Sequence, residues 1–427
     1  MGKSCSRSQF ISTYIVLNNT RLALTTNRAT LLYSSKDIEA IRHEAEDGDI
    51  DAMFDYALLH EEGVHVKKNW DLSALWYQRA AENGDVEAQF RLGHLLHLGV
   101  HDQPDDEKAV YWFLRAAMQG HAEAQCAVAI AYYNGEGLDV DLERAFYWHN
   151  EAAHQGETTS QACLGDMLIH GEGVRRARPM QGLKWLNKAA GQDDDLALYL
   201  LGSCYLYGQV VEQDEEKARE FLQRSANYGN IEAKYLLGVM LLDEERPCHD
   251  TKKALRYIRN AASEDYPPAL YTLGTIYADG YEHISPKAAT AFRYFMQAAQ
   301  ADHSAAQFRL YTCYLQGFGV EANEDTATDW LFRSAEGGCP EAQYHLGCLL
   351  FGTAASEDEL NVALNLFSAS AQQGETFAIE FLKFLRPYRR TLKKHIGKTI
   401  LLFNKFCAGK AFRRLMEAPG FSTKDFR

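Results

Sequence analysis

The fold is decided by the stretch DVEAQFRLGHLLHLGV at residues 85–100 and by DDEKAVYWFLRAAMQG, which follows it at residues 105–120. In the first stretch Ala88, Leu92 and Leu95 recur at the spacing i, i+4, i+7, which places them on one face of an α-helix. The second stretch repeats this helical spacing of apolar residues. The sequence therefore predicts two amphipathic helices joined by a polar loop.

The ends of both predicted helices carry the residue types that helix ends require. Gly99 follows the first apolar face, and Gly120 follows the second. Glycine adopts the left-handed conformation that commonly ends a helix. Asp105 stands just before the second helix, where a carboxylate accepts a hydrogen bond from an unsatisfied backbone N–H. These three residues predict a compact helical hairpin.

The hairpin recurs along the chain with a period of 36 or 37 residues. A small residue marks each copy, followed four and five places later by a pair resembling Leu-Gly. Its positions are Ala52, Ala88, Ala124, Ser160, Ala197, Ala233, Ala269, Ala306, Ala342 and Ala378. Repeats of this length stack on one another, because one unit alone cannot bury its apolar face.

A large aromatic residue recurs in the second helix of the hairpin, followed four and five places later by a pair of small residues. The aromatic positions are Trp76, Trp112, Trp148, Trp185, Phe221, Tyr257, Tyr294 and Trp330. Small residues let two helices approach closely. We therefore expect the large aromatic to fill the space between neighbouring hairpins.

Period, loop glycines and the aromatic-to-alanine spacing together resemble the Sel-one-like repeat, a relative of the tetratricopeptide repeat. The resemblance implies an all-α, right-handed solenoid of nine two-helix repeats over residues 49–374. Residues 1–36 are then expected to be a disordered leader and residues 37–48 a lead-in. Residues 375–427 are expected to form a capping helix and a basic tail.

Several positions depart from the repeat pattern. Ala129 and Tyr311 replace the glycine of the Leu-Gly pair in the third and eighth units. Glu244 replaces a loop glycine in the sixth unit, and Leu366 replaces the second-helix aromatic in the ninth. We expect these changes to alter local packing without changing the fold.

The charge of the chain is unevenly distributed. The formal net charge is −14, but residues 1–36 carry +5 and residues 379–427 carry +10, which leaves −29 on the residues between them. An acidic body argues against nucleic-acid binding, because contact with phosphates requires clustered Lys and Arg.

The nine cysteines form no C-x-x-C pair, which favours free thiols in a reducing compartment and a cytoplasmic location. The sequence contains no run of 18 apolar residues, so it predicts no membrane-spanning helix.

Positions that vary between the units are candidates for recognition of a partner. Two such positions lie three and six residues after the repeat alanine, on one face of the first helix. The polar candidates there are Asp55, Arg91, His94, Asp166, Arg309 and His345. The resemblance implies that the first helix lines the concave surface, so this ladder predicts contact with a partner protein or peptide. Lateral packing between units is the alternative for its apolar members.

No constellation of residues predicts catalysis or a cofactor. The Gly-x-Gly pairs follow helices rather than strands, and no phosphate-loop lysine accompanies them. Carboxylates gather at helix starts, where they cap the helix and complement its dipole. His94, His97 and His101 share a helical spacing with Asp102 nearby, but Gly99 is expected to end the helix before His101. We therefore predict a protein-binding scaffold with no catalytic residue, metal or cofactor.

The C-terminal segment combines apolar and basic residues at helical spacing. Leu392, Ile396, Ile400 and Phe403 can share one face. The basic residues nearby are Arg389, Arg390, Lys393, Lys394 and Lys398. A basic amphipathic helix binds anionic membranes or acidic protein surfaces. It can equally cap the last repeat. An alternative role for the chain is therefore that of a regulator held at a membrane surface by this helix.

The N-terminus supports several interpretations. Gly2 and Ser6 fit the pattern for N-myristoylation, and Cys5 fits palmitoylation. The absence of acidic residues in the first 35 positions also fits a mitochondrial presequence. A disordered leader or an unrecognised start site accounts for the same residues. A mitochondrial or lipid-anchored location thus stands beside the cytoplasmic one.

Overall fold

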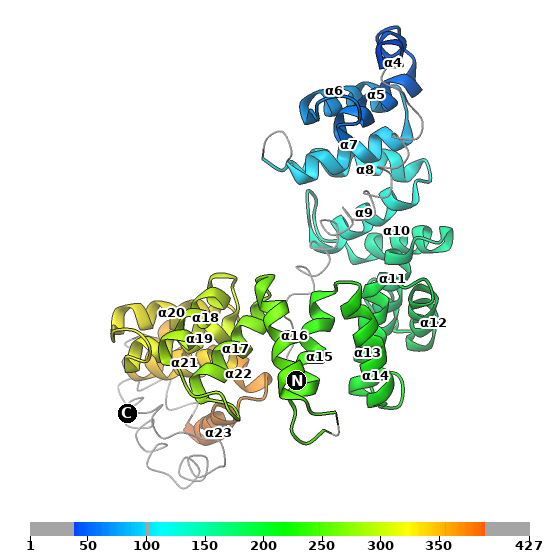
Figure 1. Ribbon diagram of the computed structural model, residues 1–427. Helices are drawn as coiled ribbons and strands as arrows, with labels where there is room; N and C mark the ends of the chain where they lie inside the picture. The colour runs from blue at the N-terminus through cyan, green and yellow to red at the C-terminus, as the bar shows by residue number, and fades with distance from the viewer. Residues whose placement is uncertain (1–37, 100–102, 247, 355, 389–427) are drawn as a thin grey trace. The chain divides into compact units, whose positions relative to one another are not determined.

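The computed structural model describes residues 38–99, 103–246, 248–354 and 356–388. These residues form twenty α-helices and one short 3-10 helix, and no strand occurs among them (Figure 1). The predicted all-α class is therefore confirmed.

Nine pairs of helices follow one another along the described chain. The first helices of the pairs are α5 (Ile50–Glu62), α7 (Val86–Leu98), α9 (Ala122–Asn134), α11 (Thr158–His170), α13 (Asp195–Tyr207), α15 (Ile231–Leu242), α17 (Pro267–Asp279), α19 (Ser304–Gln316) and α21 (Pro340–Thr353). The second helices are α6 (Trp70–Glu82), α8 (Asp106–Met118), α10 (Leu142–Gln155), α12 (Pro179–Ala190), α14 (Glu215–Asn227), α16 (Thr251–Ser263), α18 (Ala288–Gln300), α20 (Glu324–Glu336) and α22 (Glu357–Gln372). Helix α4 (Ile38–Glu46) precedes the pairs, and α23 (Thr376–Leu385) with the 3-10 helix Arg386–Tyr388 follows them.

The described residues fall into two compact units, with the boundary between Ala233 and Lys234 in α15. The first unit contains repeats 1–5, and the second contains most of repeat 6 together with repeats 7–9.

Helix ends follow the sequence signals. The Asp105 side chain accepts a hydrogen bond from the Lys108 backbone N–H and begins α8. Gly99 ends α7 with φ 64°, and Gly120 follows α8 with φ 93°, both in the left-handed region. The predicted hairpin boundaries are therefore confirmed, including the end of α7 before residue 101.

In each second helix, the residue that follows the position of the repeated aromatic carries a deeply buried large side chain. Its exposed fraction is at most 3% in every repeat. The nine residues are Tyr77, Phe113, His149, Leu186, Leu222, Ile258, Phe295, Leu331 and Phe367. We call them the core residues of the repeats.

The repeated aromatic itself is less buried than its neighbour. Trp76 and Trp112 are buried, whereas the later members of the series are half-buried. Trp112 nevertheless belongs to one buried cluster with Ala80 and Ala81 of the preceding hairpin, in agreement with an aromatic between neighbouring hairpins.

In six of the nine repeats the core residue packs directly on the glycine of the Leu-Gly pair in the same repeat. A Cβ atom added to Gly93 would lie 2.7 Å from the Phe113 ring, and one added to Gly274 would lie 2.5 Å from the Phe295 ring. Real Cβ atoms do not approach carbon so closely. The glycine therefore allows the two helices of a repeat to approach until the core residue fills the gap.

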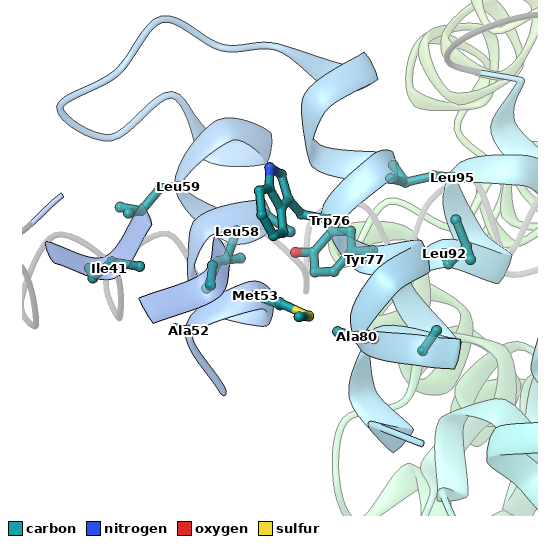
Figure 2. Packing of buried hydrophobic residues seen from close by; sticks show 14 of the residues in the cluster. Ile41, Ala52, Met53, Leu58, Leu59, Trp76, Tyr77, Ala80, Leu92 and Leu95 are labelled. Carbon is teal, nitrogen blue, oxygen red and sulfur yellow. The ribbon is translucent and has the colours of Figure 1, made fainter. Parts of the chain in front are cut away.

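Figure 2 shows how the first two hairpins share one apolar core. Trp76 and Tyr77 of α6 lie between Leu58 of α5 and the side chains Leu92 and Leu95 of α7. Because these three helices belong to two repeats, burial of the second-helix residues depends on the next hairpin being in place.

Glutamine side chains hold successive repeats in register. Gln89 donates from Nε2 to the Ala81 carbonyl oxygen at 3.1 Å, and Gln119 donates to Gln89 Oε1 at 2.8 Å. Gln125 and Gln155 repeat both bonds one unit later. These glutamine hydrogen bonds satisfy buried polar groups that would otherwise destabilise the interfaces between repeats.

We predict that Gly274→Ala lowers the free energy of unfolding by about 1–3 kcal/mol, because the new Cβ overpacks the contact with Phe295. Gly352→Ala in α21 is the matched control, because a Cβ atom added there would meet no atom within 4 Å. There the higher helix propensity of alanine should stabilise the protein by up to about 1 kcal/mol. Urea unfolding followed by circular dichroism measures both. Equal effects of the two substitutions would contradict close packing at Gly274.

Candidate functional site

The candidate partner-binding positions on the first helices differ in burial along the chain. In repeats 1–3 the residues three and six places after the repeat alanine are mostly buried: Leu58, Arg91, His94, Ala127 and Ile130. Asp55 in α5 is half-buried. The ladder positions of these repeats therefore form contacts within the chain.

A network centred on Arg91 and Glu87 connects three of the first helices. Nε of Arg91 lies 3.0 Å from Glu87 Oε1 in α7, and its terminal nitrogen lies 3.6 Å from Glu61 Oε1 in α5. Glu87 also lies 3.0 Å from Nε2 of His121, which stands at the start of α9. Burial raises the pKa of Glu87, but His121 and Arg91 outweigh it and lower that pKa to about 2. The network ties repeats 1, 2 and 3 together.

His94 is buried on the same helix. Burial lowers its pKa to about 4, and the nearby His97 and Arg91 add to this effect. His97 is engaged elsewhere, with Nδ1 2.8 Å from Asp106 Oδ1. His101 and Asp102 lie outside the described residues. Within the part of the chain that the structure describes, no group of three or more His, Cys, Asp or Glu side chains could hold a metal ion.

In repeats 6–9 the corresponding face of the first helices keeps part of every side chain exposed. We call it the repeat 6–9 face, and it also includes residues ten places after the repeat alanine. Its members are Leu236, Val239, Asp243, Thr272, Thr275, Asp279, Arg309, Thr312, Gln316, His345 and Cys348. The sequence ladder stopped one turn short of Asp243, Asp279 and Gln316, although the spacing i, i+3, i+7 could have found them.

Contacts between helices show that this face is continuous. Tyr235 Oη in α15 lies 3.2 Å from Thr272 Oγ1 in α17. Asp279 of α17 lies 3.7 Å from the Arg309 guanidinium of α19. His345 of α21 contacts the ring of Phe308 in α19 at 5.2 Å, and burial lowers the pKa of His345 to about 4. Four first helices therefore present one joined surface.

Asp166, the remaining candidate, belongs to α11 in repeat 4. Its carboxylate lies 3.1 Å from Nδ1 of His170 on the same helix, and 19% of its side chain is exposed. It lies in the unit that ends at Ala233, so it is not part of the repeat 6–9 face.

A buried polar pair joins repeats 3 and 4. His149 of α10 is fully buried, and its Nδ1 lies 3.1 Å from Oγ of Ser160 in α11. Burial lowers the pKa of His149 to about 3, so the imidazole is neutral. Both residues depart from the repeat pattern: Ser160 replaces the repeat alanine, and His149 replaces an apolar core residue. This pair substitutes a polar contact for an apolar one.

The clustered carboxylates at helix starts act as caps. Asp141 accepts the Arg144 backbone N–H, and Asp214 accepts that of Lys217, both at 3.0 Å. These contacts agree with the structural interpretation of the acidic clusters.

The basic C-terminal candidates, Arg389, Arg390, Lys393, Lys394 and Lys398, lie outside the described residues, as does the N-terminal leader. Within the described ranges, no helix has both the length and the apolar character needed to cross a membrane. The predicted role at a membrane surface therefore stays a prediction.

Paired helices, a glycine contact within six of the nine pairs and glutamine hydrogen bonds between pairs define a protein built of two-helix repeats. Nine successive segments match the Sel1 repeat, at residues 50–85, 86–121, 122–157, 159–194, 195–230, 231–266, 267–303, 304–339 and 340–375. The chain therefore belongs to the Sel1 repeat family, and the nine repeats predicted from the sequence are confirmed.

Several solved structures are similar to this chain. A Sel1 repeat protein from Oxalobacter formigenes is 29% identical over 73% of this chain and 89% of its own, with a TM-score of 0.49. The protein c5321, described as a protective antigen of uropathogenic Escherichia coli with an SLR fold, is 26% identical over 91% of both chains, with a TM-score of 0.47. Yeast Tom70 is 13% identical over 98% of this chain and 91% of its own, with a TM-score of 0.42. A comparison with curated proteins gave no match.

We predict that His149 makes stability depend on pH. Its pKa is lowered in the folded state, so the unfolded chain gains a proton there as the pH falls below 6.5, whereas the folded chain gains one only near pH 3. As the pH falls from about 6 to about 4, this side chain should therefore reduce stability by about 1 kcal/mol per unit of pH. The double variant His149→Leu/Ser160→Ala restores the repeat pattern and should remove that slope.

Chemical unfolding at several pH values measures the effect. Ser160→Ala alone is the control, because it keeps the buried imidazole and should keep the pH slope of the parent protein. An equal pH dependence in the double variant and in Ser160→Ala would show that His149 does not cause the slope.

Proposed function

We propose that the chain is a protein-interaction scaffold that binds a segment of a partner protein along the repeat 6–9 face. The supporting observation is the contrast in exposure along the first helices. The same positions are mostly buried in repeats 1–3 but keep accessible side chains over α15, α17, α19 and α21. Exposed side chains at these positions are not required for packing between repeats, so they are available to contact a partner.

The chemistry of this face suits a polypeptide. Val239 is 37% exposed and offers apolar contact, while the hydroxyl groups of Thr272 and Thr275 lie one turn apart. Asp279 and Arg309 supply opposite charges 3.7 Å apart, with 66% and 34% of their side chains exposed. Mixed apolar, hydroxyl and charged groups are typical of surfaces that bind other proteins.

The double variant Val239→Arg/Asp279→Lys tests the proposal. It places two cations on the repeat 6–9 face without altering a buried residue. Partners recovered from native lysate by the tagged full-length chain, quantified by mass spectrometry, should be reduced about tenfold or more for at least one partner, because a charge is introduced into apolar contact.

The matched control is Val362→Arg/Glu336→Lys, which makes the same kinds of change at exposed positions of second helices in the same unit. The control should retain the partner. Loss of the same partner from both variants, or its retention by the first, would rule out binding at the repeat 6–9 face.

A further inference from the structure

Three exposed apolar side chains occupy one repeat position on successive second helices. Leu75 in α6, Tyr111 in α8 and Tyr147 in α10 are 44%, 53% and 54% exposed. Each directly precedes the repeated aromatic residue. We call these three residues the outer stripe.

The repeat itself does not require an apolar residue at this position. In repeats 4–9 the same position is polar or charged and exposed: Lys184, Glu220, Arg256, Arg293, Asp329 and Asn365. Apolar character is therefore confined to repeats 1–3, and packing within the fold does not explain it.

The outer stripe lies over a shared aromatic layer. The Tyr111 ring is 5.1 Å from that of Trp112, and the Tyr147 ring is 5.1 Å from that of Trp148. Trp112 belongs to one buried cluster with Trp76 of the preceding repeat, and Trp148 packs against the cluster that holds the core residue of α8. The aromatic residues beside the outer stripe therefore link α6 to α8 and α8 to α10.

Acidic residues flank the outer stripe one helical turn earlier on each helix. Asp71, Glu107 and Glu143 are all exposed. Among the described residues, neither Glu107 nor Glu143 makes an ion pair or a side-chain hydrogen bond. This row leaves negative charge beside the apolar stripe.

The neighbouring cations are already engaged. Lys108 Nζ lies 2.7 Å from Asp105, and Arg144 lies 3.3 Å from Asp141. The Arg115 guanidinium stacks over the Trp112 ring at 5.1 Å. Arg79 and Arg115 keep their positive charge over the Trp76 and Trp112 rings, one turn after Leu75 and Tyr111. The negative charge available to a partner is therefore that of the acidic row, on the other side of the outer stripe.

From this arrangement we propose that the outer stripe and its acidic row form a second interaction surface, which binds a basic amphipathic helix of a partner protein. Seven residues of an α-helix rise about 10.5 Å, which we take as the step from one second helix to the next. A helix crossing α6, α8 and α10 therefore places apolar residues at i, i+7 and i+14 over Leu75, Tyr111 and Tyr147. Its Lys or Arg residues then reach Glu107 and Glu143.

The test uses the full-length chain and a fluorescein-labelled peptide, LKKLLKLLKKLLKLLKKL, as a probe of this chemistry. Fluorescence anisotropy measures the dissociation constant. Tyr111→Ser/Tyr147→Ser should weaken binding about tenfold, because buried tyrosines dominate such contacts. Glu107→Gln/Glu143→Gln should weaken it roughly two- to tenfold at low salt, with the difference lost near 1 M salt.

Matched controls separate this surface from general attraction to an acidic protein. Met180→Ser/Phe332→Ser removes two other exposed apolar side chains, and Glu216→Gln/Glu220→Gln removes two other exposed acids on the second helix of repeat 5. Neither should change the dissociation constant by more than about twofold. Circular dichroism confirms that all variants remain folded.

Several results would overturn the proposal. The first is absence of peptide binding by the parent chain. The second is an equal loss of affinity in the control variants. The third is equal binding of a peptide in which every lysine is replaced by glutamate, since the acidic row should repel it.

Discussion

Most repeats of this protein depend on the contact between one glycine and one core residue. Gly93 accommodates Phe113, Gly165 accommodates Leu186, and each approach is too close for a Cβ atom. The contact fixes the distance between the two helices of a repeat. It thereby sets where the remaining second-helix residues meet the next hairpin. Apolar burial, which supplies most of the stabilisation, follows from that spacing.

Three departures from the pattern meet where repeat 3 joins repeat 4. In repeat 3 Ala129 stands at the glycine position, and the core residue is His149. That imidazole is satisfied at Nδ1 by Ser160, the one serine in the series of repeat alanines. A buried polar group needs a partner, so a polar core residue in one repeat is matched by a polar residue in the next.

Exposure, rather than residue type, distinguishes the candidate positions that can contact a partner from those that join repeats. Arg91 suits partner recognition as a residue type, yet its guanidinium is buried between Glu61 and Glu87 and joins repeats. Arg309 occupies the equivalent position with a third of its side chain exposed. On the second helices, residues of similar type also differ in exposure: Tyr111 of the outer stripe is exposed, whereas the adjacent Trp112 is buried.

The sequence by itself determined the period, the helix ends and the family, because glycine, capping aspartate and apolar spacing act locally. It also located the ladder to which Arg309 and His345 belong. Only the tertiary structure decided that the residue after each aromatic forms the core, that Arg91 is buried, and that Asp279 extends the repeat 6–9 face. Those outcomes depend on how closely neighbouring helices approach, and a periodic pattern does not encode that distance residue by residue.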